Sequence, residues 1–225
     1  MKAEKAKKTR ILIVDDHPMT RAGLVHLINH QAEMVVDGEA EDAAQALDLL
    51  ASQRPDLMLI DITLPGKSGL ELIKDVKAMR PDLPMLVLSM HDESLYADRV
   101  LRAGARGYIT KHEGGDKLMG AIRHVLSGRI YVSEGMSAHI LEMFSGGQTG
   151  IDRSSIPKLS DREFEVFEAL GEGLSSHEIA KKLHLSAKTV DAHRANIKTK
   201  LKINTTAELI SFSARWAATQ SKQQM

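Results

Sequence analysis

Five short apolar runs recur between residues 10 and 128, and each is no longer than a strand. Within each run the apolar residues are continuous rather than alternating, which is typical of strands that are covered on both faces, as in a parallel sheet. We therefore predict five strands, at residues 11–14, 34–36, 57–60, 85–88 and 107–110.

The segments between these runs carry apolar residues three and four positions apart, the spacing of one face of a helix. Leu24, Leu27 and Ile28 are one such set, and we expect all three to face the core. Pro55 and Gly104 follow two of these segments, where helices commonly end. The alternation of strands and helices predicts a doubly wound α/β domain with a five-stranded parallel sheet.

Beyond residue 128 the pattern changes twice. A short periodic stretch precedes residues 145–158, which are rich in Gly and Ser and have little to bury, so that we expect a short helix and then a flexible linker. The following 60 or so residues show no strand pattern and predict a smaller all-α domain of about four helices. The predicted organisation is an N-terminal tail (1–9), the α/β domain (10–128), the short helix and linker (129–158), the helical domain (159–217) and a C-terminal tail (218–225).

Serine residues mark the starts of the helices in this second domain. Ser160 is followed three residues later by Glu163, which is a capping box. Either Ser175 or Ser176 begins the second helix, and Ser186 precedes the third. Two helices joined by such a short turn form the frame of a helix-turn-helix, whose second member enters the major groove of DNA.

Charge separates the two predicted domains. The formal net charge is zero, but residues 1–155 carry 19 basic against 22 acidic side chains and residues 156–225 carry 11 against 8. Between Lys181 and Lys202 seven side chains are basic and one, Asp191, is acidic. This density is expected of a surface that binds a polyanion, and a solvated helix face is the alternative interpretation.

The absence of cysteine excludes disulfides, thiolate zinc sites and catalytic thiols. The apolar runs fall short of the roughly 18 residues that a membrane-spanning helix needs. The basic start of the chain lacks the apolar segment of a signal peptide. We therefore expect a cytoplasmic protein with no membrane partner.

Polar residues with chemical potential follow the predicted strands. Asp15 and Asp16 follow the first strand, Asp61 the third and Lys111 the fifth, and Ser89 closes the fourth. The carboxyl ends of parallel strands meet at one edge of a sheet, so we expect these side chains to lie together. Three carboxylates need a compensating cation, and Mg²⁺ suits carboxylate, carbonyl and water ligands. Asp61 could then attack a phosphoryl group while Mg²⁺, Lys111 and Ser89 stabilise the transferred oxygens.

Four motifs carry these residues: VDDHP at 14–18, LIDITLPGKSGLEL at 59–72, LSM at 88–90 and AGARGYITK at 103–111. In residue type, position and order they resemble the receiver domain of two-component response regulators. The resemblance implies that Asp61 is the phosphoacceptor. It also implies Mg²⁺ ligands from Asp16 directly, from Asp15 through water, from Asp61 and from the carbonyl of Thr63. Ser89 and Tyr108 match the switch pair of that family, and Lys111 completes the predicted phosphate and switch residues.

Two positions depart from the common receiver pattern, since Leu64 replaces a frequent Met and His112 a frequent proline. The second departure affects the geometry of the following loop. His91, two residues after Ser89, resembles a position that tunes the lifetime of the phosphoryl group in receivers.

Residues 159–201 resemble the LuxR-type helix-turn-helix of the NarL/FixJ response regulators. That resemblance implies that exposed positions early in the third helix face base edges, and that flanking residues contact phosphates. The base-facing set is Asp191, Ala192 and Ala195, and the phosphate set is Lys188, Thr189, Arg194 and Lys198, to which helical periodicity adds Lys200. Asp191 is less usual there and could accept from a cytosine amino group or merely cap and solvate the helix.

These patterns together predict a response regulator that a sensor histidine kinase phosphorylates on Asp61 and that regulates transcription by binding double-stranded DNA as a homodimer. RNA polymerase is a further candidate partner. A phosphohydrolase is the alternative from another class, but no general acid or base and no cap domain is evident between Asp61 and Gly69. A regulator that works without phosphate is a third hypothesis, against which the intact set of acidic residues argues.

Overall fold

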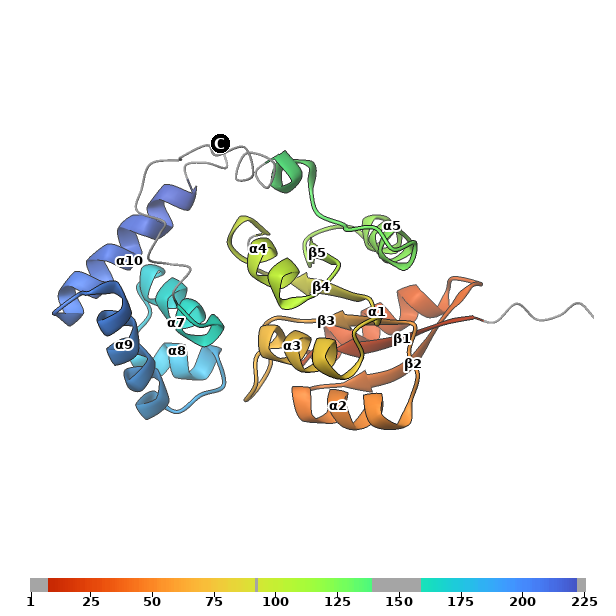
Figure 1. Cartoon of the computed structure of the whole chain (residues 1–225), viewed down its shortest axis with the longest axis horizontal. Coiled ribbons are helices and arrows are strands. Elements are labelled where there is room, and N and C mark those ends of the chain that lie inside the picture. The colour runs from red at the N-terminus through yellow and green to blue at the C-terminus, as the bar shows by residue number, and fades with distance from the viewer. Residues whose placement is uncertain (1–7, 92, 139–158, 222–225) are drawn as a thin grey trace, which may run out of the picture. The chain divides into compact units, whose positions relative to one another are not determined.

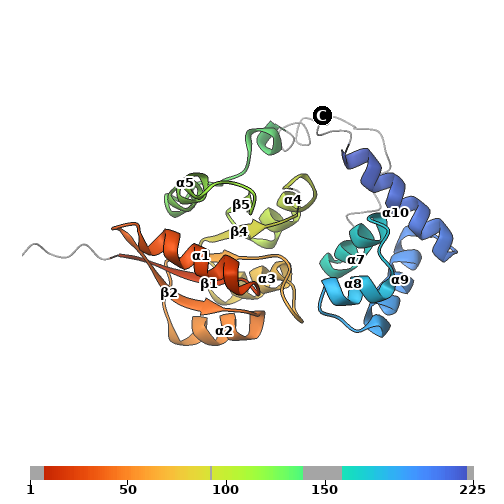
Figure 2. The same cartoon turned by 180° about the vertical axis from the view of Figure 1, so that it is seen from behind.

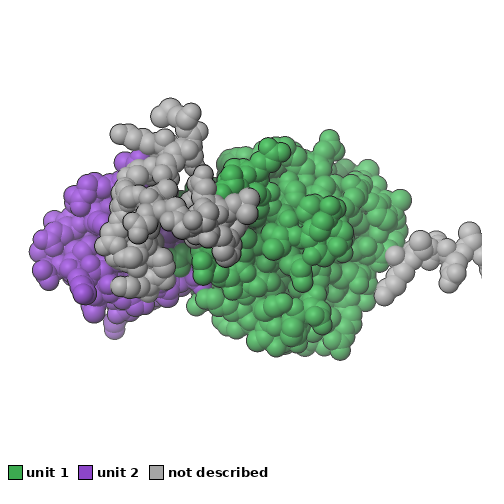
Figure 3. All heavy atoms as spheres, turned by 45° about the horizontal axis from the view of Figure 1, so that its top comes forward, with its two compact units in different colours: residues 1–147 green, residues 148–225 purple. Residues whose placement is uncertain are grey.

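The computed structural model describes residues 8–91, 93–138 and 159–221 (Figure 1). Outside the described residues lie the predicted linker at 145–158, residues 1–7 of the predicted N-terminal tail and residues 222–225 of the predicted C-terminal tail. The chain divides into two compact units, Met1–Gly147 and Gln148–Met225, which are coloured separately in Figure 3. No helix in the described part of the chain is both long and apolar enough to cross a membrane.

The first unit is built on a five-stranded parallel sheet with the strand order β2-β1-β3-β4-β5, as the apolar runs predicted. β1 pairs with β2 on one side and with β3 on the other, so the chain winds outward in two directions from β1. In open sheets of this kind the crevice for ligands lies at the carboxyl ends of the strands where the winding direction changes. The strands are β1 (Thr9–Val14), β2 (Met34–Ala40), β3 (Leu57–Ile60), β4 (Met85–Ser89) and β5 (Gly107–Thr110).

Helices cover both faces of the sheet, which explains why its strands are continuously apolar. Ile11 and Ile13 of β1 pack in one cluster with Leu24 and Ile122, which belong to the two helices α1 and α5 on the same face. The other three helices cover the opposite face (Figures 1 and 2). The helices are α1 (Pro18–Asn29), α2 (Ala43–Ser52), α3 (Gly69–Met79), α4 (Glu93–Ala103) and α5 (Gly115–Leu126).

Two details of this unit differ from the sequence prediction. β2 continues to Ala40, beyond the predicted run of 34–36, because it lies at the edge of the sheet and tolerates polar residues such as Asp37. The prediction that Leu27 faces the core is wrong, since this residue is 39% exposed. Ile28 is fully buried, so the buried stripe of α1 is narrower than the apolar pattern suggested.

Residues 134–138 are helical, within the stretch where a short helix was predicted. The remainder of that predicted helix lies outside the described residues.

The second unit contains four helices among its described residues, in agreement with the predicted all-α fold. They are α7 (Asp161–Gly171), α8 (Ser176–Lys182), α9 (Ala187–Leu201) and α10 (Thr206–Ser221). Trp216 of α10 packs against Phe164 and Phe167 of α7, with ring centroids 5.6 and 5.4 Å apart. Val190 and Ile197 of α9 are fully buried, so α9 turns one apolar stripe inward and leaves its basic side chains outside.

Candidate functional site

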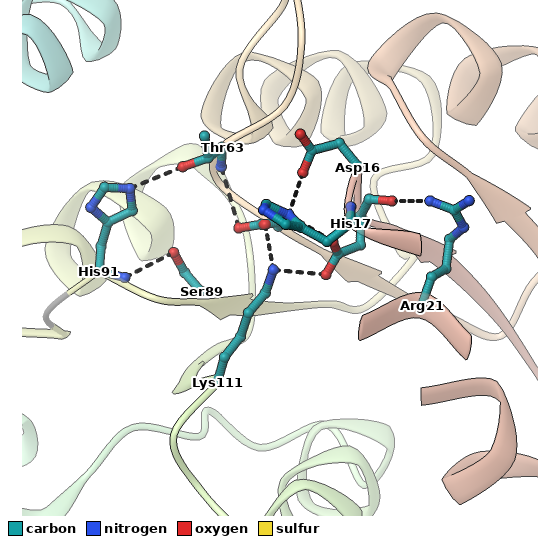
Figure 4. A network of polar contacts seen from close by, with 9 residues as sticks. Asp16, His17, Arg21, Thr63, Ser89, His91 and Lys111 are labelled. Atoms are coloured by element: carbon teal, nitrogen blue, oxygen red, sulfur yellow. Dashed lines mark hydrogen bonds and ion pairs between the residues drawn. The ribbon is translucent and has the colours of Figure 1, made fainter. Parts of the chain in front are cut away.

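The side chains that follow the parallel strands gather at the carboxyl edge of the sheet. Asp15 and Asp16 follow β1, Asp61 follows β3, Ser89 ends β4 and Lys111 follows β5. Figure 4 shows Asp16, Ser89 and Lys111 converging from three different strands. The structure therefore brings the predicted set together, and the roles assigned to its members stay predictions.

Lys111 joins two of the carboxylates. Its Nζ lies 2.8 Å from Oδ2 of Asp15 and 2.5 Å from Oδ2 of Asp61, and the three side chains are 8%, 2% and 4% exposed respectively. Charges so far from water are tolerated only when they are paired. With Asp16 included, three carboxylates face one ammonium, which leaves an excess of negative charge for a divalent cation to balance.

For both Asp61 and Lys111, burial and the neighbouring charges shift the pKa in opposite directions. Burial raises the pKa of Asp61 above its usual value, although Lys111 and the amide of Thr63 act to lower it. Burial lowers the pKa of Lys111, but Asp61 and Asp15 outweigh it and raise that pKa above its ordinary value. Lys111 therefore keeps its proton, while the ionised form of Asp61 is only partly stabilised by its surroundings. Perturbed groups of this kind concentrate at functional sites.

The donor set fits Mg²⁺. Asp15, Asp16, His17 and Asp61 are the group of potential metal-binding side chains found in the described part of the chain, and their ligand atoms lie within 4.8 Å of one another. A six-coordinate ion with bonds of about 2.1 Å places opposite ligands about 4.2 Å apart, so a single ion can reach all four side chains after small adjustments. Carboxylate oxygens are the ligands that hard divalent cations prefer.

Hydrogen bonds centred on His91 connect the loops around the pocket. Nε2 of His91 lies 3.0 Å from Oγ1 of Thr63, and the amide of His91 donates to Oγ of Ser89 at 3.2 Å. The hydroxyl of Tyr108 donates to the carbonyl of His91 at 2.8 Å. Ser89 and Tyr108 are fully buried, so both members of the predicted switch lie inside the fold and share His91 as a partner.

A glycine fixes the loop that follows Asp61. The amide of Gly69 donates to the carbonyl of Ile62 at 2.8 Å, and a Cβ on Gly69 would lie 2.0 Å from the backbone oxygen of Asp61. Such a close approach leaves room for no side chain. Ser68 and Glu71 form a capping box at the start of α3, so the chain enters a helix directly after this approach.

α8 and α9 form the predicted helix-turn-helix. Ser175 is the residue that caps α8, and Ser186 caps α9 by accepting from the amide of Thr189 at 3.0 Å. The predicted DNA-facing residues all lie on the outer side of α9 or along its margin. Lys188, Asp191, Ala192, Ala195 and Lys200 are exposed, and Thr189, Arg194 and Lys198 are half-exposed.

Asp191 has local partners. Its Oδ1 accepts from the hydroxyl of Ser176 at 2.9 Å and lies 3.5 Å from Nη1 of Arg194, which also donates to Ser176. Ser176 is the first residue of α8, so these contacts tie the start of α8 to the recognition helix. They favour the interpretation in which Asp191 organises the helices over one in which it reads a base.

Lys200 is engaged away from the outer face of α9. Its Nζ lies 2.6 Å from Oε2 of Glu163, which also accepts from the amide of Ser160 at 2.7 Å. Burial alone would raise the pKa of Glu163, but Lys200 and Ser160 together lower it below its usual value. We therefore expect Lys200 to contribute more to the fold of the second unit and less to phosphate binding than Lys198.

Several contacts at both sites were missed by the sequence analysis. Arg21 donates to the backbone carbonyl of Asp15 at 2.6 Å. Because α1 begins at Pro18 and helical side chains lean toward the N-terminus, the position of Arg21 one turn into α1 was a usable signal. The contacts of Ser176 and Glu163 with α9 span 15 to 37 positions and leave no local trace in the sequence.

Comparison with known families agrees with this geometry. Residues 11–123 match the response regulator receiver domain, and residues 157–213 match the bacterial regulatory proteins of the luxR family. The chain therefore belongs to the two-component response regulators that combine a receiver domain with a LuxR-type DNA-binding domain.

Similar proteins extend over nearly the whole chain. The oxygen regulatory protein NreC of Staphylococcus epidermidis is 35% identical over 211 residues, which are 92% of this chain and 97% of NreC. RcsB of Salmonella enterica serovar Typhimurium, solved bound to the promoter rprA in the presence of the phosphomimetic BeF₃⁻, is 26% identical with a TM-score of 0.61, covering 92% of this chain and 99% of RcsB. A LuxR-family response regulator from Aurantimonas sp. SI85-9A1 is 34% identical with a TM-score of 0.58, covering 62% of this chain and 99% of that one.

Proposed function

We propose that the receiver unit accepts a phosphoryl group on Asp61 from a sensor histidine kinase, and that the phosphorylated protein binds double-stranded DNA as a homodimer to regulate transcription in the cytoplasm. The observation that carries this proposal is the buried contact of Lys111 with Asp61 and Asp15 at the edge of a parallel sheet. A phosphoacceptor needs a carboxylate nucleophile with positive charge beside it, and this contact supplies both.

The chemistry follows from the positions of these groups. A carboxylate oxygen of Asp61 attacks the phosphorus of a phosphohistidine, and the phosphorus–nitrogen bond of the donor breaks as the new phosphorus–oxygen bond forms. Nζ of Lys111 lies 2.5 Å from Oδ2 of Asp61 and is close enough to pair with the transferred oxygens. Ser89, whose hydroxyl is the other group assigned to these oxygens, is the last residue of the neighbouring strand β4. In this proposal the receiver catalyses its own phosphorylation and the slow hydrolysis of the phosphoryl group on Asp61. It does not turn over a separate substrate.

Mg²⁺ is the cofactor of this proposal. When bound, it neutralises the charge of the transferred oxygens. The groups that would hold it are the side chains of Asp15, Asp16 and Asp61 and the backbone carbonyl of Thr63.

Incubation with acetyl phosphate and Mg²⁺ tests the phosphoacceptor. Intact mass spectrometry should detect one added phosphoryl group on the wild-type protein and none on Asp61→Asn, which lacks the nucleophile. Asp82→Asn is a matched control, because Asp82 is an exposed aspartate in the same unit and should leave phosphorylation unchanged. Label that persists on Asp61→Asn would refute the assignment.

The DNA-binding half of the proposal rests on α9. Its charged side chains are four bases, Lys188, Arg194, Lys198 and Lys200, and one acid, Asp191, and a polyanion is the partner that such a surface attracts. RcsB has been solved on promoter DNA with a phosphomimetic, and another RcsB structure contains two dimers on two DNAs. We carry both properties over to this chain as part of the proposal. Genome-wide mapping of bound DNA, with the wild type and with Asp61→Asn, tests whether binding to discrete sites depends on the phosphoacceptor.

A further inference from the structure

His17 lies among the carboxylates of the proposed metal site. It occupies the N-cap position of α1, but its side chain makes no capping hydrogen bond. Its Nδ1 instead lies 2.6 Å from Oδ1 of Asp16 and 3.5 Å from Oδ1 of Asp15. The imidazole therefore turns toward the pocket and away from the helix that it precedes (Figure 4).

We propose that His17 supplies an imidazole ligand to the divalent cation in this pocket, and that it raises the affinity of the pocket for first-row transition-metal ions such as Mn²⁺ relative to its affinity for Mg²⁺. This inference rests on the proposed metal site. Its geometric basis is that the ligand atoms of Asp15, Asp16, His17 and Asp61 all lie within 4.8 Å of one another.

The backbone around His17 is already held for this role. The amide of His17 donates to Oδ1 of Asp15 at 2.8 Å, and the next residue is Pro18, whose ring fixes the first position of α1. Little backbone freedom is left to lose when a cation binds. The side chain of His17 is 61% exposed, so the ring can exchange its contact with Asp16 for a metal bond without disturbing the core.

A nitrogen ligand affects different cations unequally. Mg²⁺ prefers oxygen ligands, retains its water and gains little from imidazole. Imidazole suits first-row transition-metal ions such as Fe²⁺, Ni²⁺ and Zn²⁺ best. Mn²⁺ stands at the weak end of that series and also prefers oxygen ligands, but it gains more from the same ring than Mg²⁺ does. The presence of His17 should therefore appear as a difference between Mn²⁺ and Mg²⁺ affinities and not as a general increase.

A simple ion pair makes the opposite prediction. If a protonated His17 only neutralises Asp16, the imidazolium competes with any cation for that carboxylate. Its removal would then strengthen the binding of Mn²⁺ and Mg²⁺ alike.

Calorimetric titration of the full chain with Mn²⁺ and with Mg²⁺ separates these cases. We expect His17→Gln to weaken Mn²⁺ binding by at least about tenfold, the scale at which loss of a group around a metal site is felt, and Mg²⁺ binding by much less. Pulsed EPR of the Mn²⁺-loaded protein should detect a bound imidazole nitrogen that is absent from His17→Gln. His26→Gln is the control, because the ring of His26 packs beside that of His30 on the exposed side of α1, so that this variant reports any adventitious binding there.

Equal weakening of both ions, tighter binding of both, or no nitrogen signal from wild-type protein would each overturn the role of His17. Failure of the wild type to bind either ion would instead refute the proposed metal site itself. Circular dichroism of His17→Gln confirms that the variant is folded before the affinities are compared.

Discussion

The buried position that suits Asp61 to its proposed role as phosphoacceptor also lowers the stability of the folded receiver unit. It lies 4% exposed beside Lys111, and burial raises its pKa despite that cation. A folded-state pKa above the unfolded value means that the folded protein binds more protons once the pH exceeds the usual 3.8 of an aspartate. Ionisation of Asp61 therefore works against folding as the pH rises through its folded pKa.

We accordingly predict that Asp61→Asn stabilises the receiver unit at pH 7, because a neutral amide replaces a poorly solvated carboxylate. The difference from the wild type should shrink as the pH is lowered toward 3.8 and vanish well below it, where the wild-type aspartate is protonated in both states. Thermal melts at several pH values measure this. A stabilisation that grows toward low pH would contradict the assigned direction of the pKa shift.

The main residues of the pocket could be predicted because strand ends are visible in the sequence. Asp15, Asp61 and Lys111 each follow an apolar run directly, and the parallel sheet brings such positions together without further information. The bonds of His91 to Thr63 and Tyr108 could not be predicted, because they depend on the conformation of the loops after β3 and β4. A hydrogen bond to a residue in a loop has no periodicity to reveal it.

Among the elements, the connection from β3 to α3 tolerates the least change. Gly69→Ala would place a Cβ 2.0 Å from the carbonyl oxygen of Asp61, so the loop or the strand end has to move. We expect a loss of about 2 kcal/mol or more in the free energy of unfolding, together with impaired phosphorylation. Gly120→Ala is the matched control, because a Cβ at that position in α5 meets nothing within 4 Å. Alanine there should be neutral or stabilising by up to about 1 kcal/mol, since it favours a helix more than glycine does. Chemical denaturation of the two variants checks both values, and equal effects would contradict the close-approach argument.

The turn between α8 and α9 yields a prediction for DNA. Asp191→Ala removes a negative charge from the DNA-facing helix and releases Arg194, so we expect tighter binding to every sequence alike. Asp191→Ala also removes the hydrogen bond that the hydroxyl of Ser176 donates to Asp191. Ser176→Ala removes that hydrogen bond without changing the charge, so we expect it not to tighten DNA binding. Titrations over operator variants with single base changes are the measurement. A loss of preference at one base position by about 1 to 3 kcal/mol would show instead that Asp191 reads a base.

Helix starts were easier to predict than helix partners. The cap residues Ser160 and Ser186 are marked by their own sequence neighbourhoods. The pairing of Lys200 with Glu163 joins residues 37 positions apart, and helical periodicity alone assigned Lys200 to the phosphates. The edge strand β2 was predicted too short for a similar reason, because the pairing that keeps its polar residues extended is not local.

For the whole molecule, binding to DNA should be dominated by counterion release. We expect a steep fall of affinity with salt and a dimer that reads two half-sites about 10 base pairs apart.

Lys198→Ala should reduce the salt slope by up to about one unit, as one phosphate contact is lost. Lys200→Ala should change the slope less and should destabilise the second unit by about 1 kcal/mol, because it frees Glu163 of the capping box. Anisotropy titrations over a range of salt concentrations, with thermal melts of both variants, distinguish the two lysines. Equal slopes for both variants would contradict the distinction.

The packing of Trp216 against Phe164 and Phe167 makes the two units optically distinct. Trp216 is the single tryptophan of the chain and belongs to the second unit, whereas the three tyrosines, at positions 96, 108 and 131, belong to the first. Emission excited at the red edge of indole absorption therefore reports on the DNA-binding unit alone. Tyrosine signals report on the receiver, where Tyr108 is bonded to His91 beside the pocket. Unlabelled protein thus carries a separate spectroscopic reporter for each half, so that the arrival of a signal at the receiver and the response of the DNA-binding unit can be timed independently in one stopped-flow experiment.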